Sequence, residues 1–154
     1  MIKTLNEGFK QLKIPYTEKI ENKFIIYRDL LKEWNQKINI TSIEDDEDIY
    51  VKHFLDSVLL LNEENYNETK SIIDVGTGGG FPGLPLKIVN NNYKVTLLDS
   101  LKKRIDFLTV VAKELLLDNV EFIHGRAEDF GQNKNYREKF DICVSRAVAP
   151  LNIL

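Results

Sequence analysis

DVGTGGGFPG, residues 74–83 of this 154-residue chain, comes directly after a short apolar run and before a helical pattern. A strand, a glycine-rich turn and a helix in this order are typical of nucleotide-binding α/β domains. Glycines are needed there because some residues must adopt positive φ, and because a missing Cβ lets backbone N–H groups approach a ligand. The stretch therefore predicts a nucleotide-cofactor loop at the carboxyl edge of a sheet.

Three further apolar runs repeat this plan along the chain. Together with the first, they span residues 71–75, 94–98, 120–123 and 140–144. Helical patterns occupy residues 82–89 and 101–117. Short apolar runs separated by helices are typical of parallel βα units. We therefore predict an α/β, Rossmann-like fold with a parallel sheet and helices on both faces. Cys143, inside the last run, is expected to be a small core residue.

The first part of the chain has helical periodicity instead. Apolar residues from Ile20 to Ile38 recur at alternate steps of four and three, which predicts a long amphipathic helix with Thr17 as its N-cap and Trp34 packed in the core. A weaker helix is expected at residues 5–12, and a third after the acidic run 44–48. A polar segment follows. The pattern therefore predicts an N-terminal helical region, residues 1–68, and a Rossmann-like domain, residues 69–154.

The composition excludes several classes of protein. The formal net charge is −3, so an anionic partner would have to be held by a local basic patch. The longest uninterrupted apolar run, residues 58–61, is far shorter than a membrane span. The chain has one cysteine and no metal-ligand spacing. We expect a cytoplasmic monomer that binds neither a membrane nor a metal.

The cofactor needs a separate argument. Gly78, Gly80 and Gly83 also match the G-x-G-x-x-G spacing of dinucleotide binders, so NAD is an alternative. An acid at the strand end suits the ammonium of a methionine tail better than a pyrophosphate. The only Tyr-x-x-x-Lys pair, residues 66–70, precedes the loop, whereas a short-chain dehydrogenase needs it afterwards. S-adenosylmethionine is therefore the predicted cofactor.

Side chains at the other strand ends complete the predicted site. Asp99 lies 21 residues past Gly78, where an acid can accept hydrogen bonds from both ribose hydroxyls. In methyltransferases of this architecture, the turn after the third strand, here residues 125–130, meets the adenine ring. The end of the fourth strand, here Ser145-Arg146-Ala147, faces the transferred methyl group.

The ordered set of motifs resembles the bacterial RsmG (GidB) family, which methylates N7 of one guanine, guanine 527, in 16S rRNA. Segments that carry the resemblance extend over nearly the whole chain. They are Trp34-Asn35, Asn39-Ile40-Thr41-Ser42, His53-Phe54-Leu55-Asp56-Ser57, Asp74 to Pro85, Leu97 to Ser100, Lys103-Arg104, Phe107-Leu108, Gly125 to Glu128 and Ser145-Arg146-Ala147.

The resemblance implies a class I S-adenosylmethionine-dependent methyltransferase fold and a small-ribosomal-subunit substrate. Cofactor-binding residues carried over to this sequence are Gly76, Gly78, Phe81, Asp99, Ala127, Glu128 and Arg146. Family members continue for several more strands and helices after the segment that ends here at Leu154. The last strands of the sheet are therefore expected to be missing.

The expected chemistry explains why no nucleophile and base pair stands out. Guanine N7 has a lone pair and no proton, so its attack on a sulfonium methyl needs placement rather than a general base. We assign no catalytic residue, and Arg146 is expected to position substrate. His53 either links the helical region to the sheet or contacts RNA. Lys52, Arg126, Arg146 and the cluster 102–104 form a basic patch for RNA or a merely solvated surface.

Three alternatives remain open at this point. The acceptor is another molecule, a protein or a small metabolite, because the cofactor loop does not specify it. The chain binds cofactor or RNA without turnover. The chain transfers hydride with a nicotinamide cofactor.

Overall fold

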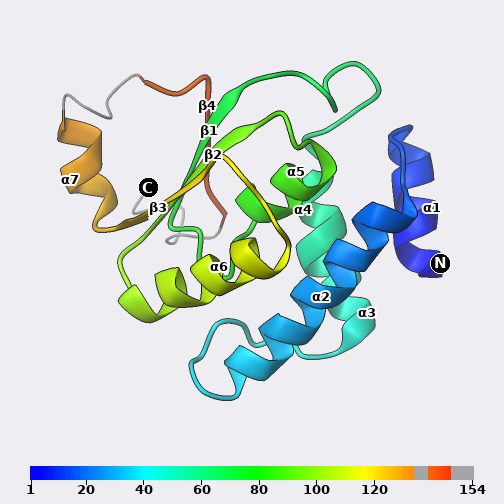
Figure 1. Ribbon diagram of the computed structural model, residues 1–154, viewed down its shortest axis with the longest axis horizontal. Helices are drawn as coiled ribbons and strands as arrows, with labels where there is room; N and C mark the ends of the chain where they lie inside the picture. The colour runs from blue at the N-terminus through cyan, green and yellow to red at the C-terminus, as the bar shows by residue number, and fades with distance from the viewer. Residues whose placement is uncertain (134–138, 147–154) are drawn as a thin grey trace, which may run out of the picture.

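A four-stranded parallel sheet lies at the centre of the protein (Figure 1). The computed structural model describes residues 1–133 and 139–146. Within them the strand order is β3-β2-β1-β4, and every neighbouring pair is parallel. The strands are β1 (Ser71–Val75), β2 (Lys94–Asp99), β3 (Val120–His124) and β4 (Ile142–Val144). The four predicted strands are thus confirmed, with differences of one or two residues at their ends.

Helices of the sheet region connect successive strands. α5 (Gly83–Val89) runs between β1 and β2, and α6 (Lys102–Glu114) runs between β2 and β3. Both pack on the strands that they connect. A short helix, α7 (Ala127–Gln132), follows β3 and was not predicted. It lies away from α5 and α6, on the other side of the strands in Figure 1.

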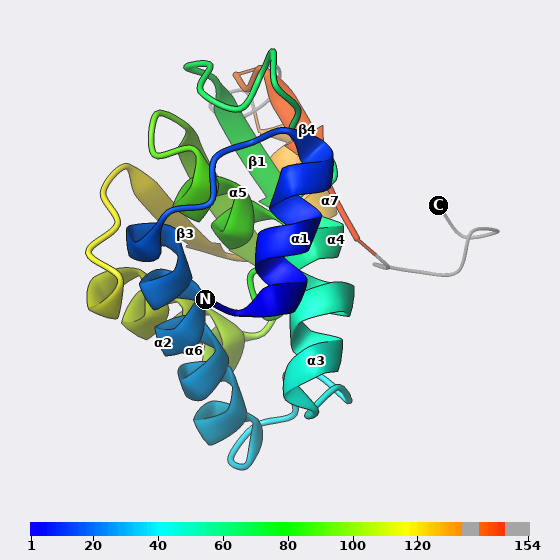
Figure 2. The same cartoon turned by 90° about the vertical axis from the view of Figure 1, so that its right-hand side faces the viewer.

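The N-terminal region is helical, as predicted. It contains α1 (Lys3–Leu12), α2 (Glu18–Asn35) and a continuous helical stretch made of α3 (Asp46–Asp48), the π-helical segment η1 (Ile49–Leu55) and α4 (Asp56–Val58). α2 contacts α5 and α6, and α4 contacts α5, so this region covers the helical side of the sheet (Figures 1 and 2).

Local signals explain where two of these helices begin. Thr17 caps α2 as predicted, because its Oγ1 accepts a hydrogen bond from the Ile20 N–H at 3.2 Å. Asp45 caps α3 in the same way, accepting from the Asp48 N–H at 3.1 Å. α2 ends at Asn35, three residues before the predicted end of the apolar stripe at Ile38.

One hydrophobic core joins the helical region to the sheet. It extends from Leu5 and Phe9 of α1 through Phe54 of η1 to Leu97 of β2 and other buried residues of α5 and α6. Trp34 packs against Phe107 of α6 with ring centroids 5.8 Å apart, which confirms its expected core role. The boundary at residue 68 remains an interpretation, because the core is continuous across it.

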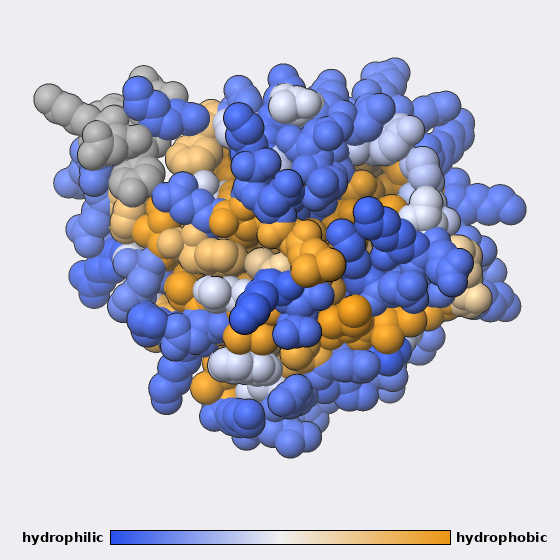
Figure 3. All heavy atoms as spheres, viewed as in Figure 1, coloured by the Kyte–Doolittle hydropathy of each residue, from blue (hydrophilic) through white to orange (hydrophobic). Residues whose placement is uncertain are grey.

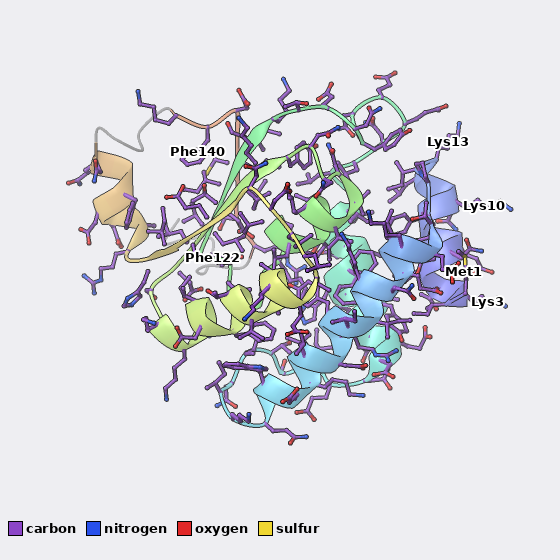
Figure 4. All side chains as sticks on the ribbon, in the orientation of Figure 1. Met1, Lys3, Lys10, Lys13, Phe122 and Phe140 are labelled. Carbon is purple, nitrogen blue, oxygen red and sulfur yellow. The ribbon has the colours of Figure 1, made fainter. Side chains whose placement is uncertain are left out.

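On the face of the molecule seen in Figure 1, the surface near α1 carries polar side chains, whereas the middle of the face carries hydrophobic ones. Lys3, Lys10 and Lys13 point away from the sheet (Figure 4). Hydrophobic side chains gather in a band across the middle of the face in Figure 3, with polar side chains above and below. Among the described residues, no helix combines the length and the apolar character that crossing a bilayer requires.

The predicted burial of Cys143 is wrong. Its side chain is exposed, whereas Ile142 and Val144 on either side of it pack against the core. Successive side chains of a strand point to opposite faces, so Cys143 points away from the helical side. β4 is also the outer strand of the described sheet. An apolar run in the sequence does not tell which of its residues faces the covered side.

Candidate functional site

A cavity of about 390 Å³ opens at the carboxyl ends of β1, β2 and β3. Its lining consists of Val75, Gly76, Leu98, Asp99, Ser100, Arg104, Gly125, Arg126, Ala127 and Glu128. Four of the predicted site residues, Gly76, Asp99, Ala127 and Glu128, therefore meet in one place. Parallel strands have all their carboxyl ends at the same edge of the sheet, which is why residues far apart in sequence converge here.

Asp99 is the best-placed polar group in this cavity. It is almost fully buried at the end of β2. Its Oδ2 accepts a hydrogen bond from the Gly78 N–H at 2.8 Å, and its Oδ1 accepts from the Leu101 N–H at 2.9 Å. Each carboxylate oxygen has a further lone pair. Asp99 is thus held in one orientation and can still accept hydrogen bonds from ligand hydroxyls.

Asp74 holds the glycine loop together from within. Its Oδ2 accepts hydrogen bonds from Thr77 Oγ1 and from the Gly83 N–H, both at 2.8 Å. The side chain is fully buried, its Oδ1 has no hydrogen-bond partner, and burial raises its pKa to about 7. Asp74 does not line the cavity. Its structural task is to tie the start of the loop to the first turn of α5.

Three loop glycines, Gly76, Gly78 and Gly80, have positive φ, and the last two differ in their surroundings. Gly78 has φ +59° and a side that faces open space. Gly80 has φ +102°, and a Cβ placed there would meet the Tyr27 hydroxyl and the side chains of Leu84 and Leu108. Gly78 does not line the cavity but has an open side, whereas Gly80 has no room for a side chain.

α2 supports the loop from the side of the core. The Tyr27 hydroxyl donates a hydrogen bond to the Gly79 carbonyl at 2.5 Å. The Tyr27 ring stacks on the Phe81 ring at 5.5 Å with an interplanar angle of 12°. The N-terminal helical region therefore helps to set the shape of the cofactor loop.

Phe81 and Arg146 contact each other outside the cavity lining. Phe81 is buried, and its ring stacks on His53 at 4.2 Å with an interplanar angle of 2°. The Arg146 guanidinium carbon lies 5.4 Å from the Phe81 centroid. Arg146 follows β4, the neighbour of β1 in the sheet. Ala147, which belongs to the same motif, lies outside the described residues.

Sequence reasoning missed the part that Arg104 plays in this site. Arg104 is a member of the predicted basic patch, yet it lines the cavity with its Nη1 3.7 Å from Asp99 Oδ1. Arg104 lies five residues after Asp99, in the first turn of α6, and this spacing alone does not show that its side chain turns back to the carboxylate. Two other patch members pair with acids one helical turn away: Lys102 with Asp106, and Lys52 with Asp48. The patch is therefore partly neutralised.

A family model described as rRNA small subunit methyltransferase G (GidB) matches residues 20–154. The chain belongs to this family. A protein named ribosomal RNA small subunit methyltransferase G from Alkaliphilus oremlandii (strain OhILAs) is 53% identical over 150 residues, which is 97% of this chain and 63% of that protein. One of the same name from Clostridium botulinum (strain Alaska E43 / Type E3) is 56% identical over 132 residues, which is 86% of this chain and 55% of that protein.

This GidB family member therefore spans about 55–63% of the length of these relatives. Solved structures agree on its fold. A putative protein-L-isoaspartate O-methyltransferase from Plasmodium falciparum, in complex with S-adenosyl-L-homocysteine, matches with a TM-score of 0.54 and 20% identity, over 93% of this chain and 72% of the other. A putative S-adenosylmethionine-dependent methyltransferase from Methanococcus maripaludis matches with a TM-score of 0.51 and 18% identity, over 78% and 48% of the two chains.

The predicted class I methyltransferase fold is thus confirmed for this GidB family member. Across residues 1–133 and 139–146, no group of three or more His, Cys, Asp or Glu side chains is arranged to hold a metal ion.

Proposed function

We propose that this chain binds S-adenosylmethionine and belongs to an enzyme that methylates N7 of guanine 527 in 16S rRNA. The observation that carries the proposal is the cavity in which Gly76, Asp99, Ala127 and Glu128 meet, in a chain of the rRNA small subunit methyltransferase G family. The cavity lies where open α/β sheets bind their ligands, at the carboxyl edge beside the strand order switch between β1 and β4.

The residues that line the cavity fit an adenosine, with separate contacts for its ribose and its adenine. Asp99 would accept hydrogen bonds from the ribose hydroxyls, because both of its oxygens are fixed and retain lone pairs. Ala127 and Glu128 would contact the adenine, with the Glu128 carboxylate accepting from its exocyclic amine. The backbone at Gly76 and Gly78 would approach the rest of the cofactor, since Gly78 faces open space.

For methyl transfer to a guanine N7, these residues would have to bind and orient the cofactor and the guanine, and none would have to move a proton. The cofactor supplies an electrophilic methyl group on a sulfonium sulfur. The acceptor nitrogen has a lone pair and no proton, so no residue of this chain has to act as a base. Arg146, with its planar fork of donors, would hold an RNA phosphate or a base edge beside the site. The Phe81 ring, over which the Arg146 guanidinium lies, would help to hold it in this position.

We further propose that the chain acts as a monomer in the cytoplasm, where small-subunit particles are assembled. Size-exclusion chromatography with light scattering would give the mass of one chain under this proposal.

The cofactor proposal is tested by titration of the chain with S-adenosylhomocysteine in a calorimeter. Asp99→Asn should weaken binding at least about tenfold, because one ribose acceptor is replaced by a donor. Asp106→Asn is the matched control, since Asp106 pairs with Lys102 on the exposed side of α6. Wild-type chain that is folded and does not respond to the ligand would refute the cofactor site.

The acceptor proposal is tested with labelled S-adenosylmethionine and small-subunit particles that lack the modification. Radioactivity should appear in the rRNA as N7-methylguanine. Label in a protein, or in a small metabolite from a bacterial extract, would replace the rRNA proposal with another acceptor. Cofactor binding without any transfer would favour a chain that binds but does not turn over.

A further inference from the structure

A continuous polar contact chain runs from Arg146 into the N-terminal helical region. Arg146 Nη2 lies 3.0 Å from His53 Nδ1, and Arg146 Nη1 lies 3.2 Å from Ser57 Oγ and 3.3 Å from Asp56 Oδ2. A guanidinium is always protonated and can only donate hydrogen bonds. His53 Nδ1 must therefore carry a lone pair, and the proton of the neutral ring must be on Nε2.

The opposite side of the His53 ring is held just as firmly. Nε2 lies 2.8 Å from Thr41 Oγ1, so the imidazole donates to the threonine hydroxyl. Thr41 Oγ1 also accepts from the Ile43 N–H at 3.1 Å. Asn35, the last residue of α2, accepts from the backbone N–H groups of Ile40 and Thr41 with its Oδ1, both at 2.9 Å. The end of α2 thereby fixes the loop that orients His53.

Aromatic packing holds the His53 ring at the centre of this contact chain, whereas the Arg146 side chain stays 28% exposed. His53 is only 6% exposed and lies flat on Phe81, which also lies below Arg146. Burial and the positive charge of Arg146 lower the pKa of His53 to about 4, so the imidazole is neutral near pH 7. The titratable groups around it are Arg146 after β4, Asp56 on its own helix and Tyr27 on α2 beyond Phe81.

We propose that Asn35, Thr41 and His53 form a positioning relay that holds the Arg146 guanidinium over Phe81 at the carboxyl edge of the sheet. The inference rests on the proposed methyl-transfer function of that edge. Under this proposal, the N-terminal helical region positions a side chain of the site in addition to packing against the sheet domain. Segments that are far apart in the sequence are joined through His53 to Arg146, which can then present its remaining donors to an RNA phosphate or base.

The first test concerns the relay alone and needs no substrate. Nitrogen NMR of the histidine rings should show His53 as the Nε2–H tautomer from pH 5.5 to 8. The chain has one other histidine, His124. The His53→Asn variant lacks the His53 signals, so its spectrum shows which signals belong to His124. Arg146→Met keeps a long side chain without the charge, and the pKa of His53 should rise measurably in it. A wild-type Nδ1–H tautomer, or an unchanged His53 pKa in Arg146→Met, would overturn the proposal.

The second test separates positioning from folding. His53→Phe keeps the ring on Phe81 and removes the acceptor for Arg146, whereas His53→Asn keeps an acceptor near Nδ1 and removes the ring. We expect kcat for methyl transfer to small-subunit particles to fall about tenfold or more in His53→Phe and to recover partly in His53→Asn. Dissociation constants for S-adenosylhomocysteine should stay within about twofold in both, because neither variant changes the cavity lining.

The outcomes of the two proposals can be told apart. If wild-type chain neither binds S-adenosylhomocysteine nor transfers a methyl group, the proposed function fails, while the tautomer and the pKa still report on the relay. If His53→Phe melts at a lower temperature but keeps the wild-type kcat, His53 has only a structural role and the relay is refuted. Thr41→Val should give a smaller loss of kcat than His53→Phe, because it removes only the second contact of the ring.

Discussion

Alanine substitutions at Gly78 and Gly80 should differ in their consequences, although the two glycines lie two positions apart in one loop. Both have positive φ, so both alanine variants carry backbone strain. Only Gly80 is surrounded: a methyl group there would overlap the Tyr27 hydroxyl and would lie 2.9 Å from Leu108 Cδ2 and 3.0 Å from Leu84 Cδ1. A methyl group on Gly78 meets no protein atom within 4 Å.

The expected magnitudes follow from these surroundings. Gly78→Ala should lower the free energy of unfolding by about 1–2 kcal/mol, the cost of placing an L-residue in the left-handed region. Its melting temperature should then fall by roughly 3–6 °C in a chain of this size. Gly80→Ala adds overlap with buried side chains to the strain and should cost about 3–5 kcal/mol. Affinity for S-adenosylhomocysteine should fall at least about tenfold in Gly78→Ala, because its methyl group occupies ligand space.

Two measurements decide the matter. Urea unfolding gives the two stabilities, and calorimetry with S-adenosylhomocysteine gives the affinity of the folded variant. If Gly78→Ala binds the ligand as wild type does, the open side of Gly78 is not the cofactor side. If Gly80→Ala is as stable as Gly78→Ala, the tight contact of the loop with α2 and α6 is not a constraint on the fold.

Three further experiments test the Tyr27 hydrogen bond to the glycine loop, the raised pKa of Asp74 and the exposure of Cys143. Tyr27→Phe leaves the Gly79 carbonyl without its donor, so urea unfolding should show a loss of about 1–3 kcal/mol, and an unchanged midpoint would deny that bond. The raised pKa of Asp74, about 7 against about 4 in an unfolded chain, means that the folded state holds a proton more tightly; stability from this group is present below pH 4 and is lost as pH rises to about 7. Asp74→Asn should therefore show a flatter stability profile between pH 4 and 7, and a parallel profile would contradict the assignment. Cys143 should react with a thiol reagent in the native chain at a rate near that of the unfolded chain, whereas strong protection would restore the buried position expected from the sequence.

Much of the fold was accessible from local pattern. The Thr17 cap, the amphipathic stripe of α2 and the four strand positions follow from side-chain spacing, which acts over a few residues. Asp99 followed from its distance past the glycine loop, and the structure places it in the cavity with Gly76. Patterns fail where burial depends on a partner from elsewhere: Cys143 is exposed on the outer strand, and α7 is short and has no apolar stripe of its own.

The candidate site likewise has features that the sequence predicts and features that only the structure shows. Chain order alone places Gly76, Asp99, Ala127 and Glu128 at strand ends, and the rule that parallel strands share a carboxyl edge brings them together. Nothing in the order of residues shows that Arg104 turns back to Asp99, that Asp74 is enclosed by its own loop, or that His53 bridges Thr41 and Arg146.

The sequence by itself thus determined the four strands, the main helices and the edge at which the predicted site lies, because these depend on periodicity and on spacing along the chain. The ordered motifs indicated the family through their resemblance to it. Only the tertiary structure decided how Phe81, His53 and Arg146 pack together and which side of Gly78 is open. Hydrogen bonds and ring stacking act over 3–6 Å between residues that are up to 93 positions apart in the chain, and no local pattern records such contacts.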